Sequence, residues 1–184
     1  MDSLENQLLI AMPSLMDPFF YKTVTYICEH NDHGAMGLVI NSPIDITLNE
    51  LLEQINEQKP FADTLEQRVL SGGPVAQNKG FVLHSQQPGW SSSLQLSNEL
   101  MITTSKDILM SLGTELAPKH YLVTLGYAGW EPGQLEQEIS QNSWLTLPAD
   151  NEILFLTPAE QRWQKATEKL GINLAHLSHD IGHA

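Results

Sequence analysis

The stretch CEHNDHG at residues 28–34 combines side chains that could carry out chemistry. Cys28 and His30 stand two residues apart on an expected strand, so their side chains would share one face. A thiol beside an imidazole is the smallest pair that can form an activated nucleophile. The same residues have the composition of a tight turn, because Asn, Asp and Gly favour bends. The stretch therefore predicts a nucleophile or a bend, and its composition favours the bend.

Histidines elsewhere raise two further possibilities. His84 follows the apolar run GFVL, where its ring could lie at a sheet edge and take part in catalysis, or could cap the strand. Near the C-terminus three histidines and an aspartate have helical spacing and are potential metal ligands, although Gly182 would break such a helix: His176, His179, Asp180 and His183. The sequence leaves metal binding by these residues open. We otherwise expect no metal site, no cofactor and no catalytic residue.

Glycine-rich and aromatic turns predict a binding surface. In SGGPV (71–75) two glycines follow a strand, and their N–H groups could form an anion nest or simply make the turn. In LGYAGWEPGQLEQE (125–138) the aromatic side chains could contact a ligand or partner, or Trp130 could fill the core. We expect a ligand or partner to contact residues of these turns and of the 28–43 stretch: His30, Asn31, Asn41, Gly72, Gly73, Tyr127, Gly129 and Trp130.

Net charge argues against direct binding to nucleic acid. The chain has 22 acidic and 9 basic residues and a formal charge of −13. A polynucleotide backbone is neutralised by clustered Lys and Arg, and here the basic residues are spread along the chain. We therefore expect the partner to be a protein or a small ligand.

Length and composition predict a single globular domain over residues 1–184. The chain is 41% hydrophobic, in short runs that suit a globular protein. The N-terminal apolar run 8–12 is far shorter than the roughly 20 residues of a membrane span. Asp2 and Glu5 argue against a secretory signal, and one cysteine excludes an internal disulfide. We expect a cytoplasmic protein that does not contact the membrane.

Short runs rich in β-branched and aromatic residues predict nine strands, at 8–12, 23–29, 36–41, 68–71, 80–84, 94–97, 101–104, 121–127 and 153–156. The connection between 94–97 and 101–104 is too short for a crossover, so these two must be antiparallel. With helices between the strands, the pattern predicts an α+β fold with a mixed sheet.

Four helices have recognisable start signals. Thr47 and Glu50 have the spacing of a capping box, and Thr157 and Glu160 repeat it with Pro158 at the first helical position. The second of these helices is expected to run to Leu170, where Gly171 would end it. Further helices are expected over 106–113, after Ser105, and from Gly133 onward.

The chain resembles the YqgE/AlgH family of bacterial proteins from end to end. The resemblance lies in the blocks LLIAMPSLMDPFFYKTVTYICEHNDHGAMGLVINSP (8–43), SGGPV (71–75), KGFVLHS (79–85), ITTSKDIL (102–109), LGYAGWEPGQLEQEISQNSWLTLPAD (125–150), RWQKA (162–166) and the terminal GHA. It implies an α+β domain whose mixed sheet curls into a barrel-like core flanked by helices. AlgH is described as a regulator of alginate gene expression. The family has no established catalytic residue, so the resemblance assigns none.

The sequence supports two hypotheses of function. The first is a non-enzymatic binding or regulatory module that acts through a protein or a small ligand, because glycine-rich and aromatic turns dominate the distinctive blocks. The second is a small-molecule enzyme, for example a hydrolase, that uses Cys28 with His30, or His84. An acidic protein without a basic stripe is not expected to hold DNA by itself, so regulation would be indirect.

Overall fold

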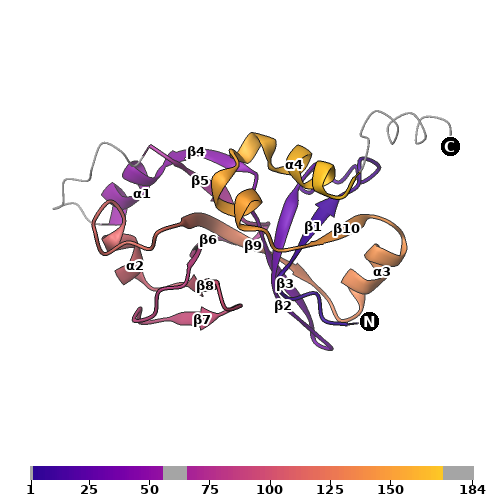
Figure 1. Ribbon diagram of the computed structural model, residues 1–184, viewed down its shortest axis with the longest axis horizontal. Coiled ribbons are helices and arrows are strands. Elements are labelled where there is room, and N and C mark those ends of the chain that lie inside the picture. Colours follow the sequence, from indigo (N-terminus) through magenta and orange to yellow (C-terminus); the bar gives the residue numbers. More distant parts are fainter. Residues whose placement is uncertain (1, 56–65, 172–184) are drawn as a thin grey trace.

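Ten strands form one curled sheet in the computed structural model, which describes residues 2–55 and 66–171 (Figure 1). The strands are β1 (Gln7–Ala11), β2 (Val24–Asn31), β3 (Gly34–Val39), β4 (Pro43–Thr47), β5 (Arg68–Ser71), β6 (Val75–Ser85), β7 (Ser93–Gln95), β8 (Leu100–Thr103), β9 (Tyr121–Trp130) and β10 (Trp144–Pro148). The helices are α1 (Leu48–Ile55), α2 (Lys106–Ser111), α3 (Gln134–Ser140) and α4 (Arg162–Lys169), with a π-helical turn η1 (Glu152–Leu156) and a 3-10 turn η2 (Ala159–Gln161).

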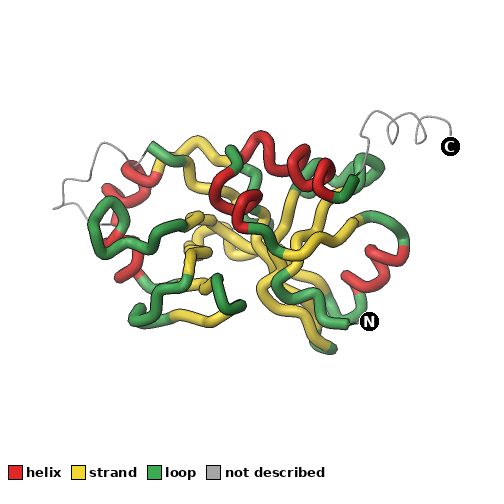
Figure 2. The backbone as a smooth tube through the Cα atoms, viewed as in Figure 1, coloured by secondary structure: helices red, strands yellow, loops and turns green. Residues whose placement is uncertain are grey.

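Strand β9 is the centre of the sheet. Neighbouring strands run in the order β10-β1-β2-β3-β9-β6-β8-β7, and β5 joins β4 to β9. Every described pair is antiparallel except β5 with β9. The helices lie around the outside of the strands (Figure 2). The predicted α+β fold, with a mixed and mostly antiparallel sheet curled between helices, is confirmed.

Apolar side chains on both faces of the sheet explain why helices cover it. Within β1, Leu8 and Ile10 pack into an inner core, whereas Leu9 packs on the opposite face beside α3. In β6, Leu83 belongs to the inner core and Val82 packs with residues of α1 and α2. This alternation follows from the two-residue period of a strand. The sheet is therefore buried on both sides where these strands pass.

Several predicted helix ends are confirmed. The N–H of Glu50 donates to Oγ1 of Thr47 at 3.2 Å, and the N–H of Thr47 donates to Oε1 of Glu50 at 3.3 Å, which completes the capping box of α1. Helix α4 ends at Lys169, and Gly171 follows with φ of 75°, the left-handed conformation that glycine accepts. Helix α3 begins directly after Gly133, as expected.

The predicted strand at 153–156 is wrong, because these residues form the π-helical turn η1. Oδ1 of Asp150 accepts the N–H groups of Glu152 and Ile153, at 2.8 and 3.3 Å. The N–H of Leu154 donates to the carbonyl of Asp150 at 2.9 Å. An aspartate that satisfies free N–H groups starts a helical turn, and here it outweighs the strand propensity of Ile-Leu-Phe-Leu.

The second predicted capping box is also wrong. The hydroxyl of Thr157 donates to the carbonyl of Glu152 at 2.7 Å and closes η1, so it does not cap α4, which begins only at Arg162. Strands β4 and β10 are additions that the sequence pattern did not predict. The three C-terminal histidines, His176, His179 and His183, lie outside the described residues. Within 2–55 and 66–171 no helix is long and apolar enough to cross a bilayer.

Candidate functional site

Cys28 and His30 lie on opposite faces of β2, contrary to the expected alternation. Strands β2 and β3 pair Ile27 with Gly37 and Glu29 with Met36, which leaves Cys28 as the extra residue of a β-bulge. Cys28 packs into the inner core, whereas the ring of His30 reaches α3. The bulge shifts the two-residue period by one position. The candidate thiol–imidazole pair is therefore not formed.

Both ring nitrogens of His30 are already in use. Its Nδ1 lies 2.9 Å from the backbone N of Leu4, which can only donate, so Nδ1 carries no proton. Its Nε2–H then donates to Oε1 of Glu136 at 2.7 Å. This hydrogen bond lowers the pKa of Glu136. With no free lone pair, His30 ties the N-terminal segment to α3 and is not available as a general base.

Cys28 does not have the environment of a nucleophile. Its side chain is buried, and burial raises the pKa of its thiol well above the usual range, with a further contribution from Glu29. A thiolate is the reactive form, and it is disfavoured here. Cys28 therefore behaves as a small apolar side chain of the core.

His84 lies inside the sheet and not at its edge, because β6 runs between β8 and β9. The ring is fully buried, and burial lowers its pKa. Its Nδ1 lies 2.8 Å from the carbonyl oxygen of Ser85, and its Nε2 lies 2.7 Å from Oγ1 of Thr103. The alternative of a histidine exposed at a sheet edge is therefore wrong. No substrate can reach the ring in this arrangement.

The residues expected to contact a ligand separate into two groups, one at each end of β3. Asn31 and Trp130 line a shallow pocket of about 160 Å³ at the hairpin end, where Gly129 pairs with Met36. Asn41 lies beyond the other end of β3, and the carbonyl of Gly72 accepts the N–H of Val39 there. The first and last of the six residues of β3 are five steps of roughly 3.3 Å apart, which separates these ends by roughly 17 Å. These residues do not form one continuous site.

Asn41 and the glycine pair hold β-strand ends in place. Oδ1 of Asn41 accepts the N–H of Val24 at 2.8 Å, and its Nδ2 donates to the carbonyl of Lys22 at 2.9 Å. The N–H of Gly72 donates to the carbonyl of Leu125 at 2.8 Å. A Cβ at Gly73 would lie 1.9 Å from the backbone carbon of Tyr127. Glycine is needed because two backbones cross in contact.

Trp130 belongs to an aromatic cluster that the sequence pattern did not reveal. Its Nε1–H and that of Trp144 both donate to Oε1 of Glu138, at 3.1 and 3.0 Å. Phe20 packs against both indoles, with ring centroids 6.2 and 5.5 Å away. Tyr127 lies in a different contact, edge-on to Phe81 at 5.9 Å. The indole of Trp130 is thus a buried core group bound to a carboxylate on α3.

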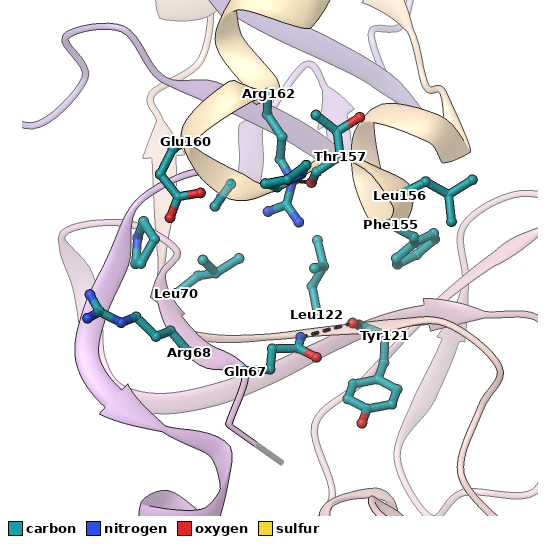
Figure 3. Close-up of a pocket in the computed structure, with 13 residues that line it drawn as sticks. Gln67, Arg68, Leu70, Tyr121, Leu122, Phe155, Leu156, Thr157, Glu160 and Arg162 are labelled. Atoms are coloured by element: carbon teal, nitrogen blue, oxygen red, sulfur yellow. Dashed lines mark hydrogen bonds between the residues drawn. The ribbon is translucent and has the colours of Figure 1, made fainter. Parts of the chain in front are cut away.

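A pocket of about 460 Å³ opens between β5, the start of β9, and the η1 and η2 turns (Figure 3). We call it the arginine pocket, because Arg68 and Arg162 both line it. Its other lining residues are Pro43, Gln67, Leu70, Tyr121, Leu122, Phe155, Leu156, Thr157, Pro158, Ala159 and Glu160. None of these was among the predicted contact residues. Phe155 and Leu156 of the lining belong to η1, where the sequence pattern predicted a strand.

Arg162 dominates this pocket. The residue is only 6% exposed, and its guanidinium points into the pocket. Nε donates to the carbonyl of Thr157 at 3.0 Å, and Nη1 donates to the carbonyl of Ile40. Within the described part of the chain no carboxylate lies within ion-pair distance of it. Burial lowers the pKa of Arg162 to about 10, although the negative charge of Glu160 acts in the opposite direction, and the guanidinium stays charged at pH 7.

The remaining lining combines apolar and polar side chains. Leu70, Leu122 and Phe155 contribute hydrocarbon and ring surface, and Leu156 is 66% exposed at the rim. Nε2 of Gln67 donates to the carbonyl of Tyr121 at 3.4 Å. Among the described residues, Glu160 contributes the only carboxylate of the lining. A pocket of this kind can hold an anionic group at Arg162 and an apolar group beside it.

The whole described chain matches known proteins in sequence and in fold. A family model described as AlgH-like matches residues 8–175. The chain belongs to the AlgH-like family. A UPF0301 protein of Colwellia psychrerythraea is 65% identical over the full length of both chains, and one of Shewanella loihica is 55% identical, also over both full lengths.

One solved structure supports the same assignment to the AlgH-like family, and a second shares the fold. The solution structure of AlgH from Pseudomonas aeruginosa is 47% identical, with a TM-score of 0.80, and the match covers 96% of this chain and 93% of that one. A crystal structure of a Corynebacterium diphtheriae protein has a TM-score of 0.74 at 21% identity, covering 97% and 92% of the two chains. The second match shows the shared fold alone.

Proposed function

We propose that this AlgH-like protein is a non-enzymatic binding module of the cytoplasm, and that its ligand is a small organic anion held in the arginine pocket. The observation that carries the proposal is the buried guanidinium of Arg162. It keeps its charge at pH 7, and its two described hydrogen bonds go to neutral carbonyl groups. A buried charge is costly unless it is paired. Glu160 compensates this charge only from beyond ion-pair distance, and a carboxylate or phosphate on the ligand supplies a direct pair.

The ligand is expected to carry an apolar portion as well as the anionic group. Leu70, Leu122 and Phe155 line the pocket beside the guanidinium. Arg68 adds a second positive charge, while Glu160 repels a dianion more strongly than a monoanion. These charges favour a monocarboxylate with an aliphatic or aromatic body. The net charge of −13 disfavours long polyanions, so the proposal does not include direct binding to nucleic acid.

The residues that line the arginine pocket favour binding over catalysis. Among the described residues that line it there is no histidine or cysteine. The hydroxyl of Thr157 is bound to the carbonyl of Glu152, so it is not an activated nucleophile. The pocket thus supplies recognition groups, and a regulatory response would pass through η1, whose residues form one wall.

The test uses hexanoate as a probe on the full chain, followed by amide NMR shifts. Saturable shifts are expected at β5, at η1 and η2, and at Tyr121 and Leu122. Arg162→Lys keeps the charge but loses the planar fork, so we expect about tenfold weaker binding, because a hydrogen bond to a charged group contributes about 1.5 to 3 kcal/mol. Hexanol is expected to bind more weakly than hexanoate.

Matched variants keep this test interpretable. Arg68→Gln changes an exposed lining residue and is expected to weaken hexanoate binding, whereas Lys119→Gln changes an exposed lysine outside the lining and is expected to leave it unchanged. Glu160→Gln is expected to tighten it, because it removes a repulsive charge. Equal binding of hexanoate to wild type, Arg162→Lys and Arg68→Gln would contradict the proposal. A thermal melt of each variant verifies that it is folded.

A further inference from the structure

Strand β7 forms one end of the curled sheet, and among the described residues β8 is its only strand neighbour (Figure 1). The N–H of Thr104 in this pair donates to the carbonyl of Ser92. Opposite residues of antiparallel strands alternate between bonded and non-bonded pairs, so the backbone groups of Ser93 and Gln95 point away from β8. Two N–H groups and two carbonyl groups are thus left facing the free edge.

The sequence of β7 does little to protect this edge. Proteins shield exposed strand edges with charged side chains, proline or a covering element. The three residues of β7, SLQ, are all exposed, and the surrounding stretch 86–98 contains no charged residue. Strand β10, at the other end of the sheet, ends in Pro148, which has no N–H to offer. Only the short length of β7 limits pairing with a further strand.

An apolar pocket of about 310 Å³ lies beside this free edge. Leu94 lines it and is 59% exposed. The pairing of Leu94 with Ile102 puts both side chains on the inner face of the sheet, where Phe81 of β6 also lies. Cys28 and Met36 complete the apolar lining from β2 and β3. No lining residue is shared with the arginine pocket, so this surface is independent of the proposed function.

Charged groups of both signs lie near this apolar pocket. Glu29 is part of its lining, and Nζ of Lys79 lies 5.5 Å from the ring centroid of Phe81. The two charges are opposite, so neither an anion nor a cation is favoured inside the pocket. The apolar lining therefore favours an uncharged apolar side chain.

We propose that the edge of β7 binds an extended peptide segment of a partner protein, which adds an antiparallel strand and places an apolar side chain in this pocket. The two peptide residues opposite Ser93 and Gln95 each exchange two hydrogen bonds with them. The peptide residue between these two lies opposite Leu94, so its side chain is on the inner face and enters the pocket. Its neighbours project from the outer face, beside the polar side chains of β7, and are themselves polar.

Net charge favours a partner protein over a second copy of this chain. Two copies carry −13 each and repel one another, and a three-residue pairing offers little to offset that repulsion. A segment with basic residues on either side of the paired ones is instead attracted to the acidic chain. The occupant is therefore a basic segment with a polar–apolar–polar centre.

The test titrates the full chain with the peptide KTLTK, acetylated and amidated at its ends, and follows amide NMR shifts at pH 7. Saturable shifts are expected in β7, β8 and residues 28–36. N-methylation of both threonines removes the two donors that face β7, so we expect at least about tenfold weaker binding. N-methylation of the leucine alters an N–H that points away from β7 and is the matched control, with unchanged affinity expected. The peptide has no carboxylate, so the arginine pocket is not expected to respond.

Variants of the chain test the same pairing from the other side. Gln95→Pro removes an N–H at the free edge and leaves the hydrogen bonds between β7 and β8 in place, so binding of KTLTK is expected to be lost. Gln95→Ala loses the same side chain but keeps the N–H, and it is expected to bind as wild type does. Leu94→Ser removes apolar surface from the pocket and is expected to weaken binding. A thermal melt verifies that each variant is folded.

Three results would overturn the proposal. The first is equal binding of the two N-methylated peptides, which does not depend on the folding of any variant. The second is unchanged affinity for KTLTK in folded Gln95→Pro. The third comes from sedimentation of the chain alone: a dimer that Gln95→Pro abolishes would assign the edge of β7 to a second copy instead of a partner.

Discussion

Nε2 of His30 lies 2.7 Å from Oε1 of Glu136, although 106 residues of sequence separate them. This hydrogen bond joins β2 to α3 and lowers the pKa of Glu136 below its ordinary value of 4.5. A lowered folded pKa means that the stabilisation is complete above pH 4.5 and disappears as pH falls through the folded value. The contact is therefore a pH-dependent link between two elements.

Glu136→Gln keeps an oxygen acceptor but loses its charge, and it is expected to lower the melting temperature near pH 7 by about 2–4 °C, because a hydrogen bond to a charged group contributes about 1 kcal/mol more than a neutral one. The difference from wild type is expected to shrink below pH 4.5, where the wild-type carboxylate takes up a proton. Melting curves at several pH values provide the measurement, with Glu115→Gln as the control. A difference that does not change with pH would show that the carboxylate charge plays no part.

Glu138→Ala is expected to destabilise the fold by about 3 kcal/mol, because the Nε1–H groups of Trp130 and Trp144 both lose their acceptor in a buried cluster. Urea unfolding followed by tryptophan fluorescence measures this loss. Glu138→Gln keeps an oxygen at the same place and is expected to lose less. Equal losses in the two variants would mean that the shared acceptor contributes little.

Gly73→Ala is expected to prevent folding or to cost several kcal/mol, since the new Cβ would lie 1.9 and 2.0 Å from the backbone carbon and oxygen of Tyr127. Gly80→Ala is the matched control, because its nearest neighbour is a side-chain atom at 3.9 Å. It is expected to stay within about 1 kcal/mol of wild type. Circular dichroism and urea melts distinguish the two. A stable, native-like Gly73→Ala would contradict the close crossing of the two backbones.

Cys28 is expected to react with iodoacetamide at pH 8 at least about tenfold more slowly in the folded chain than in urea, since burial raises the pKa of its thiol. Mass spectrometry of the labelled protein gives both rates. The chain has one cysteine, so the signal comes from this residue alone. Equal rates in the two states would place the thiol in solvent.

The sequence pattern predicted those parts of the fold that depend on local contacts. Thr47 and Glu50 are three residues apart and cap α1 as expected, because the capping box needs no distant partner. Residues 153–156 were assigned wrongly because Asp150, just outside the run, sets their conformation. That aspartate is the signal that could have indicated a helical start.

The candidate sites were harder to predict because their residues come together only through long-range packing. In the sequence, Arg162 lies in the charged run RWQKA and resembles a surface residue. In the structure it is buried, and it donates a hydrogen bond to the carbonyl of Ile40, 122 residues away. Contact between a ligand and Asn31, Asn41, Gly72 or Trp130 is still only predicted from the sequence.

The position of β9 also has a consequence for the newly made chain. It pairs with β3, β5 and β6, all of which are synthesised before it. A nascent chain that ends before Tyr121 therefore leaves these three strands without their shared neighbour and exposes open edges. Closure of the sheet has to wait until residues 121–130 leave the ribosome, so premature termination before that point yields a fragment prone to aggregate.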